Sequence, residues 1–401
     1  MKLKNINIVF FILIIMFFFI GNIFVDNEEK IIKDENRLSA SFPKLSIAGI
    51  YSGEFFRDFE KYYGDHFIGR DSFISLSTVI NSYKGVQSSN KVELMEYEGV
   101  NTVKDTDWGR ILILNNGAME INSFNETAAT NYGKSINEYS LRFPSVNIYS
   151  MLIPTKIDFI EEEKYKDLSV SQKETIALTQ DFFNDNIINV NVWNNLYDHK
   201  DEYLYFRTDH HWTQRGAFYA YQELAKLMGE EIPKIDNYTI SKHEDFLGSL
   251  YLLTKSEELL KEPDYIEVFN YDLPHKYYGI GDKVVNNEGS IYVKEWLDTE
   301  EKYAVFMGGD YPLLKIETEN NFGRNILVLK DSYANAFIPF LTGVADNIVV
   351  VDPRLYKDDI DSVIKEHNIT DIIFVNYALI TRNDGYGDLY LNLLKGYEEN
   401  K

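Results

Sequence analysis

The stretch Ile326-Leu-Val-Leu-Lys-Asp-Ser-Tyr-Ala-Asn335 decides the fold that this sequence predicts. Its apolar run, 326–329, has the composition of a buried strand, and a helix is expected from Tyr333. Ser332 therefore stands at a strand-to-helix turn, where a side chain is exposed at the carboxyl end of a sheet beside the free amides of the helix start. The segment predicts a parallel sheet with a nucleophile, Ser332, at its edge.

A second stretch, Tyr205-Phe-Arg-Thr-Asp-His-His-Trp-Thr213, places an acid, two imidazoles and an indole at four consecutive positions. A hydroxyl is a weak nucleophile until an imidazole removes its proton, and that imidazole needs a carboxylate to fix its tautomer. Asp209 and His211 can supply both groups. If the segment is extended, their side chains point to one face and His210 points to the other. We therefore expect His211 as base, Asp209 as the acid that orients it, and His210 as a structural histidine.

Strands and helices alternate through the rest of the chain, which is typical of a parallel sheet covered on both faces. Strands are expected at 109–115, 146–153, 190–193, 326–329, 347–351 and 372–375, and helices at 127–141, 170–183, 214–228, from 333 and at 360–367. Between about 232 and 321 short apolar runs are broken by Gly, Asp and Asn, which indicates a β-rich insertion or lid.

The N-terminus carries Lys2 and Lys4 before an apolar run, 8–20, that continues to Val25. The length fits either a signal peptide or a spanning helix, but no small-x-small cleavage site follows. An uncleaved signal anchor is therefore favoured over a cleaved signal peptide. It would cross the cell membrane once, with the chain from Asp26 onward on the extracytoplasmic side. The expected organisation is an anchor at 1–25, a linker and helical region at 26–100, and a catalytic domain at 101–401.

Composition excludes several classes of function. The formal net charge is -23, from 63 acidic and 40 basic residues, which argues against nucleic acid as a partner because phosphate binding needs a basic surface. There is no cysteine, so disulfides, thiolate nucleophiles and Cys-ligated metals are excluded. A strongly anionic polymer would need a local basic path, which the sequence does not locate.

Several motifs together resemble one family. They are Thr208-Asp-His-His-Trp-Thr213 followed by Gly216-Ala217, Lys330-Asp-Ser-Tyr-Ala334, 59–71, Pro154-Thr-Lys156, 303–309 and Val351-Asp-Pro-Arg354. This set resembles the DHHW family, which is similar to the SGNH-hydrolase-like O-acetyltransferases of alginate and exopolysaccharide acetylation. The resemblance covers most of the chain after the N-terminal apolar run.

The resemblance implies an SGNH-hydrolase-like α/β fold, a flavodoxin-like parallel sheet with flanking helices. The order would be permuted, because Asp209 and His211 precede Ser332 instead of following it. The Ser332 amide and the Asn376 side chain, after strand 372–375, are the candidate oxyanion donors, although Asn376 can equally be a strand-end residue that caps a turn. Candidate substrate-binding residues are Arg354, Tyr333, Trp212 and His210, although Arg354 can equally form an ion pair and both aromatic residues can pack in the core.

The implied activity is an extracytoplasmic O-acetyltransferase that moves an acetyl group onto hydroxyls of a cell-surface or secreted polysaccharide through a serine ester. The implied acetyl donor is a multispanning membrane O-acyltransferase, and neither cofactor nor metal is required. Three alternatives stay open: a carbohydrate esterase with the same triad, an inactive glycan-binding scaffold, and a metal-dependent phosphoesterase suggested by Asp-His-His. Metal-dependent phosphoesterases of this kind carry further Asp-rich metal-binding motifs upstream of Asp-His-His, and the sequence contains none of the required kind.

Overall fold

The computed structural model divides the chain into two compact units, residues 1–90 with 104–106 and residues 91–103 with 107–401. It describes residues 53–70, 93–96, 110–161, 168–270, 275–280, 286–288 and 291–394, together with scattered positions between 16 and 73. Each unit is considered by itself. The second unit holds the central sheet and every candidate site residue.

The first unit contains helix α3 (Glu54–Asp65) and the short pair β1 (Ile31–Ile32) and β2 (Arg37–Leu38). His66 ends α3, and its Nδ1 lies 2.9 Å from the carbonyl of Tyr62, which is a structural role. Of the expected anchor at 1–25, all but three positions lie outside the described residues, as does much of the linker and helical region expected at 26–100. Among the described residues no helix is long and apolar enough to span a membrane.

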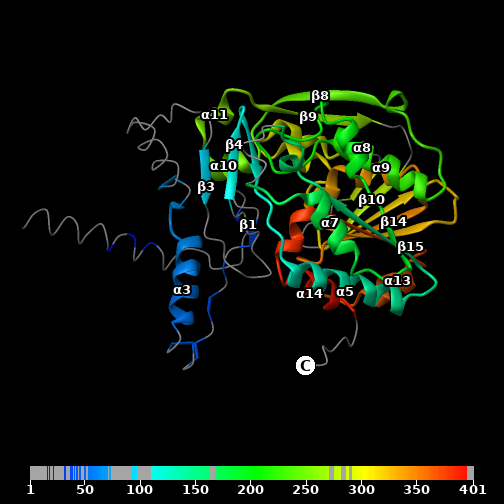
Figure 1. Cartoon of the computed structure of the whole chain (residues 1–401), viewed down its shortest axis with the longest axis horizontal. Helices are drawn as coiled ribbons and strands as arrows, with labels where there is room; N and C mark the ends of the chain where they lie inside the picture. Colours follow the sequence, from blue (N-terminus) through cyan, green and yellow to red (C-terminus); the bar gives the residue numbers. More distant parts are fainter. Residues whose placement is uncertain are drawn as a thin grey trace, which may run out of the picture. The chain divides into compact units, whose positions relative to one another are not determined.

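The second unit is built on an eight-stranded sheet in the order β11-β10-β12-β14-β13-β15-β6-β7 (Figure 1). Its five parallel strands are β14 (Asn347–Val351), β13 (Asn325–Lys330), β15 (Asp371–Tyr377), β6 (Asn147–Ile153) and β7 (Ile187–Asn189). Counted from β13 through the C-terminus and on to β6 and β7, this order is 2-1-3-4-5, the flavodoxin-like arrangement. The permutation expected from the position of Ser332 is therefore present in the sheet.

Three further strands extend the sheet beyond β14. These are β12 (Leu313–Thr318), β10 (His275–Ile280) and β11 (Asn286–Glu288), each antiparallel to its neighbour. The rest of the range 232–321 contains the hairpin β8 (Thr239–Phe246) and β9 (Asp264–Asn270) and the short helices α10 (Ser249–Thr254) and α11 (Glu257–Leu260). The range is rich in strands, as expected, and three of them complete the central sheet.

Alternation along the strands separates two hydrophobic cores. Even-numbered residues of β13 and β14 and odd-numbered residues of β15 pack with α9 (Gln214–Leu227) and α12 (Ile338–Leu341). The alternate residues pack with α5 (Glu126–Arg142), α13 (Ile360–Glu366) and α14 (Tyr386–Leu391), which lie together below the sheet in Figure 1. Because both faces are covered, these strands read as continuous apolar runs.

Most of the expected elements are confirmed within a few residues, including β6, α5, α9, β13, β14, α13 and β15. The helix at 170–183 is shorter, as α7 (Gln172–Gln180). The strand at 190–193 is wrong: β7 ends at Asn189, and Trp193 begins α8 (Trp193–Asp198). The strand at 109–115 exists as β4 (Arg110–Leu114), but it belongs to a separate antiparallel sheet with β3 (Glu93–Glu96) and β5 (Gly117–Glu120).

Leu327, in the middle of β13, has no exposed surface and packs in the core that α5, α13 and α14 cover. Leu327→Ala should lower the free energy of unfolding by about 2–5 kcal/mol, because the substitution removes buried methyl groups and leaves a cavity. The matched change Leu141→Ala, at a side chain that is 65% exposed, should stay within about 0.5 kcal/mol. Urea unfolding followed by tryptophan fluorescence measures both, and equal effects would contradict this placement of β13.

Candidate active site

Ser332 is presented by the turn that follows β13. The next segment is a 3₁₀ helix, Ser332–Ala336, and Asp331 caps it by accepting a hydrogen bond from the amide of Tyr333 (2.9 Å). The amide of Ser332 donates to no acceptor within the part of the chain that the structure describes. This is the strand-to-helix turn expected from the sequence, with a 3₁₀ helix in place of an α-helix.

The Asp-His-His-Trp segment forms a tight hairpin whose two sides meet at the bridge between Tyr205 and Trp212. Asp264, at the start of β9, fixes this hairpin from beneath: its carboxylate accepts from the amides of Arg207 (2.8 Å) and Thr208 (2.6 Å). Asp264 has no exposed surface. The segment is therefore bent, so the condition of an extended backbone, under which Asp209 and His211 would share a face, is not met.

The hairpin brings His211 against Ser332, 121 residues away in the sequence. His211 Nδ1 lies 2.6 Å from Asp209 Oδ1, and His211 Nε2 lies 2.8 Å from Ser332 Oγ. Because a carboxylate only accepts, Nδ1 carries the proton and Nε2 is left to accept from the serine hydroxyl. The three predicted catalytic residues thus form one hydrogen-bonded series in the order that nucleophilic catalysis requires.

Asp209 is held as a carboxylate on both of its oxygens. Oδ1 also accepts from the His211 amide (2.9 Å), and Oδ2 accepts from the amide (2.7 Å) and hydroxyl (2.8 Å) of Ser249. Burial alone would raise the pKa of Asp209, but the two neighbouring imidazoles and these hydrogen bonds hold it well below its ordinary value. Asp209 is thereby fixed to orient the imidazole. Sequence reasoning missed Ser249, because no pattern connects it to the hairpin.

His210 lies beside the site in neutral form. Burial, reinforced by His211, lowers the pKa of His210 to about 3. Its Nδ1 lies 2.7 Å from Ser249 Oγ, and its ring centre lies 3.7 Å from that of His211. These contacts assign His210 a supporting role at the back of the triad.

Asp209, His210 and His211 also offer three potential metal-ligand atoms within 4.8 Å of one another. In the hydrogen-bonded arrangement, however, Asp209 Oδ1 and His211 Nδ1 are bonded to each other and His210 Nδ1 is bonded to Ser249. A metal ion held through those atoms would have to displace the bonds that orient His211 toward Ser332. The donor set is therefore arranged for the serine.

Asn376 takes a different place from the one expected. Its amide donates to Asp331 Oδ2 (3.2 Å), and its carbonyl accepts from the hydroxyls of Tyr132 and Tyr390, each at 2.9 Å. These partners lie on the α5 and α14 side of the sheet, away from His211. Asn376 thus does not direct a free donor at Ser332. Instead, it helps to hold Asp331, whose pKa burial raises to about 6.

Arg354 lies in a buried ion-pair network behind the Ser332 turn. It contacts Asp352 at 2.6 Å and Asp310 at 2.8 Å. Lys330, which is only 1% exposed, contacts Asp310 and donates to Asn335 Oδ1 (2.8 Å). This network joins the end of β13 to the loop before β12. The contacts place Arg354 in an ion pair, the alternative to substrate binding.

The two aromatic residues expected at the substrate wall are part of the core. Trp212 has no exposed surface and donates from Nε1 to the carbonyl of Tyr333 (2.8 Å), while Tyr333 is 1% exposed and donates from its hydroxyl to the carbonyl of His210. The residue that does line the imidazole is Tyr303. Its ring stacks on His211 at 4.0 Å and 13°, and its hydroxyl donates to the carbonyl of Ser332 (3.1 Å).

A family model described as DHHW protein matches residues 89–351, which confirms the resemblance that the motifs indicated. A solved structure of a DHHW family protein from Eubacterium siraeum is 28% identical and matches with a TM-score of 0.65, over 75% of this chain and 99% of that one. PatB1 from Bacillus cereus, solved with a sulfonyl adduct, is 19% identical with a TM-score of 0.58, over 68% of this chain and 97% of its own. Among proteins with curated descriptions, none matches.

Gly248 packs directly on the carboxylate that orients His211. A Cβ added at this position would lie 2.2 Å from the Cβ of Asp209 and 2.5 Å from its Oδ2. Gly248→Ala should therefore displace Asp209 and slow the reaction of Ser332 with a serine-directed sulfonyl fluoride by at least about tenfold, because loss of the correct tautomer alone can cost more than that.

The matched control is Gly64→Ala, a helical position where an added Cβ meets nothing within 4 Å. This variant should react at the wild-type rate. Adduct formation on Ser332 is followed by intact mass, with circular dichroism to verify folding. A Gly248→Ala variant that folds and reacts normally would show that the contact with Asp209 is not restrictive.

Proposed function

The chain belongs to the DHHW family, and on this premise we propose that it is a serine-dependent O-acetyltransferase. It moves an acetyl group through an ester on Ser332 to a hydroxyl of a cell-surface or secreted polysaccharide. The observation that carries the proposal is the hydrogen-bonded series from Ser332 through His211 to Asp209. All three residues lie within the range 89–351 that the family model matches.

In the first half-reaction the Ser332 oxygen attacks the acetyl carbonyl, while His211 Nε2 takes the hydroxyl proton. Asp209 stabilises the imidazolium that forms. Charge develops on the carbonyl oxygen, and the unpaired amide of Ser332 is the donor positioned to meet it. When the bond to the donor breaks, His211 returns the proton to the leaving oxygen and the acetyl ester remains on Ser332.

In the second half-reaction a sugar hydroxyl attacks the ester. His211 takes the proton of that hydroxyl and passes it to the Ser332 oxygen as the new ester leaves, so the enzyme returns to its starting state. No group outside the protein and its two substrates is needed for proton balance. A carbohydrate esterase would run the same steps with water as acceptor, and this is the second candidate function.

The burial of the site favours a small acyl group. Ser332 is 7% exposed and His211 is 5% exposed, with the ring of Tyr303 stacked on the imidazole. A narrow approach admits an acetyl group and a single projecting hydroxyl more readily than a long acyl chain. It also limits water at the ester, which transfer requires. An inactive scaffold fits less well, because a binding protein gains nothing from a polarised serine.

The membrane setting is part of the proposal. The basic and apolar N-terminal sequence supports a single-pass anchor in the cell membrane, with the catalytic unit on the extracytoplasmic side. A multispanning membrane O-acyltransferase is the proposed acetyl donor at that surface. These assignments rest on the sequence.

The test of the triad uses a chromogenic acetyl ester and the whole chain. Ser332→Ala and His211→Ala should each reduce chromophore release by about 10³-fold or more, and Asp209→Asn by about 10⁴-fold, because the imidazole then adopts the wrong tautomer. Wild type should gain the mass of one acetyl group on Ser332. Ser362→Ala and His243→Ala, at positions outside the site, serve as matched controls that keep full activity.

Adding oligosaccharide acceptors separates the two candidate functions. A transferase gives acetylated sugar at the expense of acetate, whereas an esterase gives acetate whatever acceptor is present. If the variants and wild type behave alike while folded, the triad assignment is wrong. Inhibition by a chelator in that case would favour the metal-dependent alternative.

A further inference from the structure

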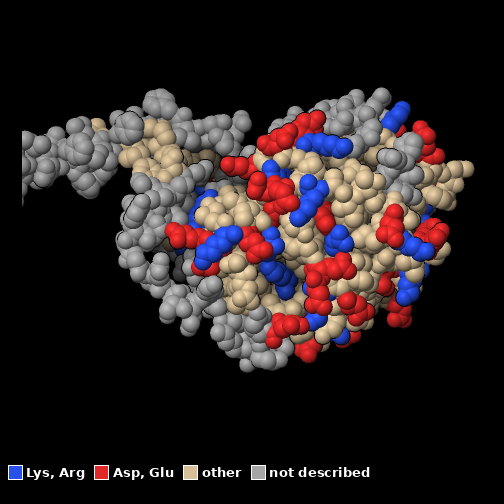
Figure 2. All heavy atoms as spheres, turned by 90° about the horizontal axis from the view of Figure 1, so that it is seen from above, with Lys and Arg blue, Asp and Glu red and all other residues tan. Residues whose placement is uncertain are grey.

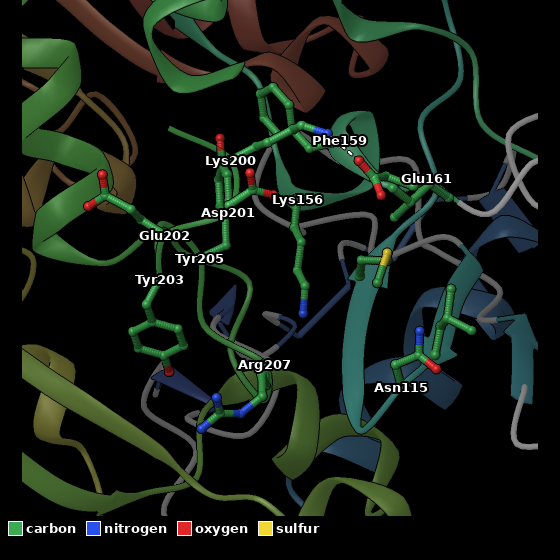
Figure 3. Close-up of a pocket in the computed structure, with 13 residues that line it drawn as sticks. Asn115, Lys156, Phe159, Glu161, Lys200, Asp201, Glu202, Tyr203, Tyr205 and Arg207 are labelled. Carbon is green, nitrogen blue, oxygen red and sulfur yellow. Dashed lines mark hydrogen bonds and ion pairs between the residues drawn. The ribbon is translucent and has the colours of Figure 1, made fainter. Parts of the chain in front are cut away.

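A cavity lies beside Tyr205 and Arg207, which line it together with Lys156 (Figure 3). It has a volume of about 420 Å³, within the size range of small-molecule sites. Its apolar part is lined by Leu114 and Met119 of the three-stranded sheet. Its opposite wall comes from the 3₁₀ helix Lys156–Phe159 and from residues that lead into the hairpin. The mechanism above uses none of these cavity-lining groups.

Lys156 projects into this cavity from the Pro-Thr-Lys motif (Figure 3). Its ammonium group has no hydrogen bond or ion pair within the part of the chain that the structure describes. Gly117 makes room for it, because a Cβ there would lie 2.4 Å from Lys156 Nζ. A half-buried ammonium without a counter-ion is costly, so this position is suited to a ligand that supplies the negative charge.

The other two cations of the cavity already have partners. Lys200 pairs with Glu161, as the dashed line in Figure 3 marks. Arg207 donates to the carbonyl of Pro263 (2.8 Å) and lies 3.4 Å from Glu262. Lys156 is therefore the group in this cavity that an incoming anion can neutralise without breaking a described ion pair.

The walls of the cavity suit a sugar ring. The rings of Phe159 and Tyr205 stack with their centres 5.7 Å apart. The Tyr205 hydroxyl donates to the carbonyl of Pro154, so a ligand in the cavity would contact the aromatic rings and not this hydroxyl. Aromatic faces pack well on the apolar faces of sugars. At the rim the exposed carboxylate of Asp201 can accept hydrogen bonds from sugar hydroxyls.

We propose that this cavity binds a sugar unit that carries one anionic group, a carboxylate or a phosphate, with Lys156 as its counter-ion. The inference rests on the proposed function in one respect: the bound unit would belong to the acceptor polymer, held while a neighbouring hydroxyl reaches Ser332. Tyr205 and Arg207 line the cavity, and Asp209 and His211 follow in the same hairpin. One segment thus connects the two sites.

The charge of the molecule makes such a local site necessary for an anionic polymer. The chain carries a net charge of -23. On the face shown in Figure 2 basic and acidic side chains are interspersed, with no broad basic area. A polymer with one charge per recognised unit can be held by a single buried ammonium, where attraction is less screened than at the surface. The cavity volume and the one cation among its described lining residues that has no partner, Lys156, fit one charged ring better than a highly charged chain.

Binding is measured on the full chain by titration calorimetry with glucuronic acid, glucose 1-phosphate, glucose and inorganic phosphate. Glucuronic acid, glucose 1-phosphate or both should bind, and Lys156→Met should weaken that binding by at least about tenfold, because the buried ion pair is lost. Lys226→Met, at an exposed lysine of α9, is the matched control and should bind as wild type does. Comparing the affinities for glucuronic acid and glucose 1-phosphate shows whether the cavity prefers a carboxylate or a phosphate.

The pH dependence adds a second readout. Burial, reinforced by the positive charge of Arg207, lowers the pKa of Lys156 to about 8, and Asp264 and Glu262 offset part of this shift. The anion needs the ammonium form, which is present below that pKa and lost above it, so glucuronic acid should bind about tenfold more weakly at pH 9 than at pH 7.

The other charged groups that face the cavity or influence Lys156 are Lys200, Arg207, Glu161, Asp201, Glu202, Glu262 and Asp264. The hydrogen bond to Glu161 raises the pKa of Lys200, and burial raises the pKa of Tyr203 and Tyr205. A pH-independent affinity would contradict the role given to Lys156.

Ser332→Ala separates this proposal from the proposed function. Sugar binding should be unchanged in Ser332→Ala, in which hydrolysis of the chromogenic ester is lost. Failure of the ester assay alone would overturn the proposed chemistry and leave the binding site standing. The binding proposal is overturned if neither anionic sugar binds, if Lys156→Met binds them normally, or if glucose or inorganic phosphate alone binds as tightly.

Discussion

The contact between the hairpin at Asp209 and the turn at Ser332 is the constraint on which the site depends. It joins two segments 121 residues apart, and several buried polar contacts hold them in register: Trp212 donates to the carbonyl of Tyr333, and Tyr333 donates to the carbonyl of His210. Asp264 fixes the hairpin from its other side. Because each of these groups would be costly to leave unpaired in the core, the hairpin has one stable position. The imidazole is therefore set before any substrate arrives.

The sequence predicts the sheet and the triad for reasons that are local. The run 326–329 and its neighbours are apolar on both faces, which is how a covered parallel strand reads, and the triad residues lie in two short motifs. The order of the strands in the sheet is harder to predict from the sequence. It places the first parallel strand by sequence, β6, beside the last, β15. Long-range pairing of this kind leaves no trace in hydrophobic periodicity.

The position of Asn376 depends on which face of the sheet its side chain occupies, and not only on the edge of the sheet at which its strand ends. Both Asn376 and Ser332 stand at strand ends on the same edge of the sheet, which made them look like partners. Successive side chains of a strand point to opposite faces. Ile372 and Phe374 belong to the core under α5 and α14, so Asn376 continues on that face with Asp331. Parity along β15 could have placed Asn376 away from His211, whereas nothing in the sequence points to Ser249 or Tyr303.

Two lysines of the catalytic unit show how differently the fold treats a buried charge. Lys330 is 1% exposed, and its ammonium contacts Asp310 and Asn335, with Asp352 at 3.6 Å. That charge is neutralised inside the protein, and its effect is to fix the end of β13. Lys156 lies in a cavity, and no carboxylate of the described residues is within hydrogen-bond distance of its ammonium group. Removing an ammonium from water without a partner lowers stability, and a neutral residue of similar length would avoid that cost. A lysine at this position is physically reasonable when the missing charge comes from outside, which is the reason to regard the cavity as a binding site and the Lys330 network as structure.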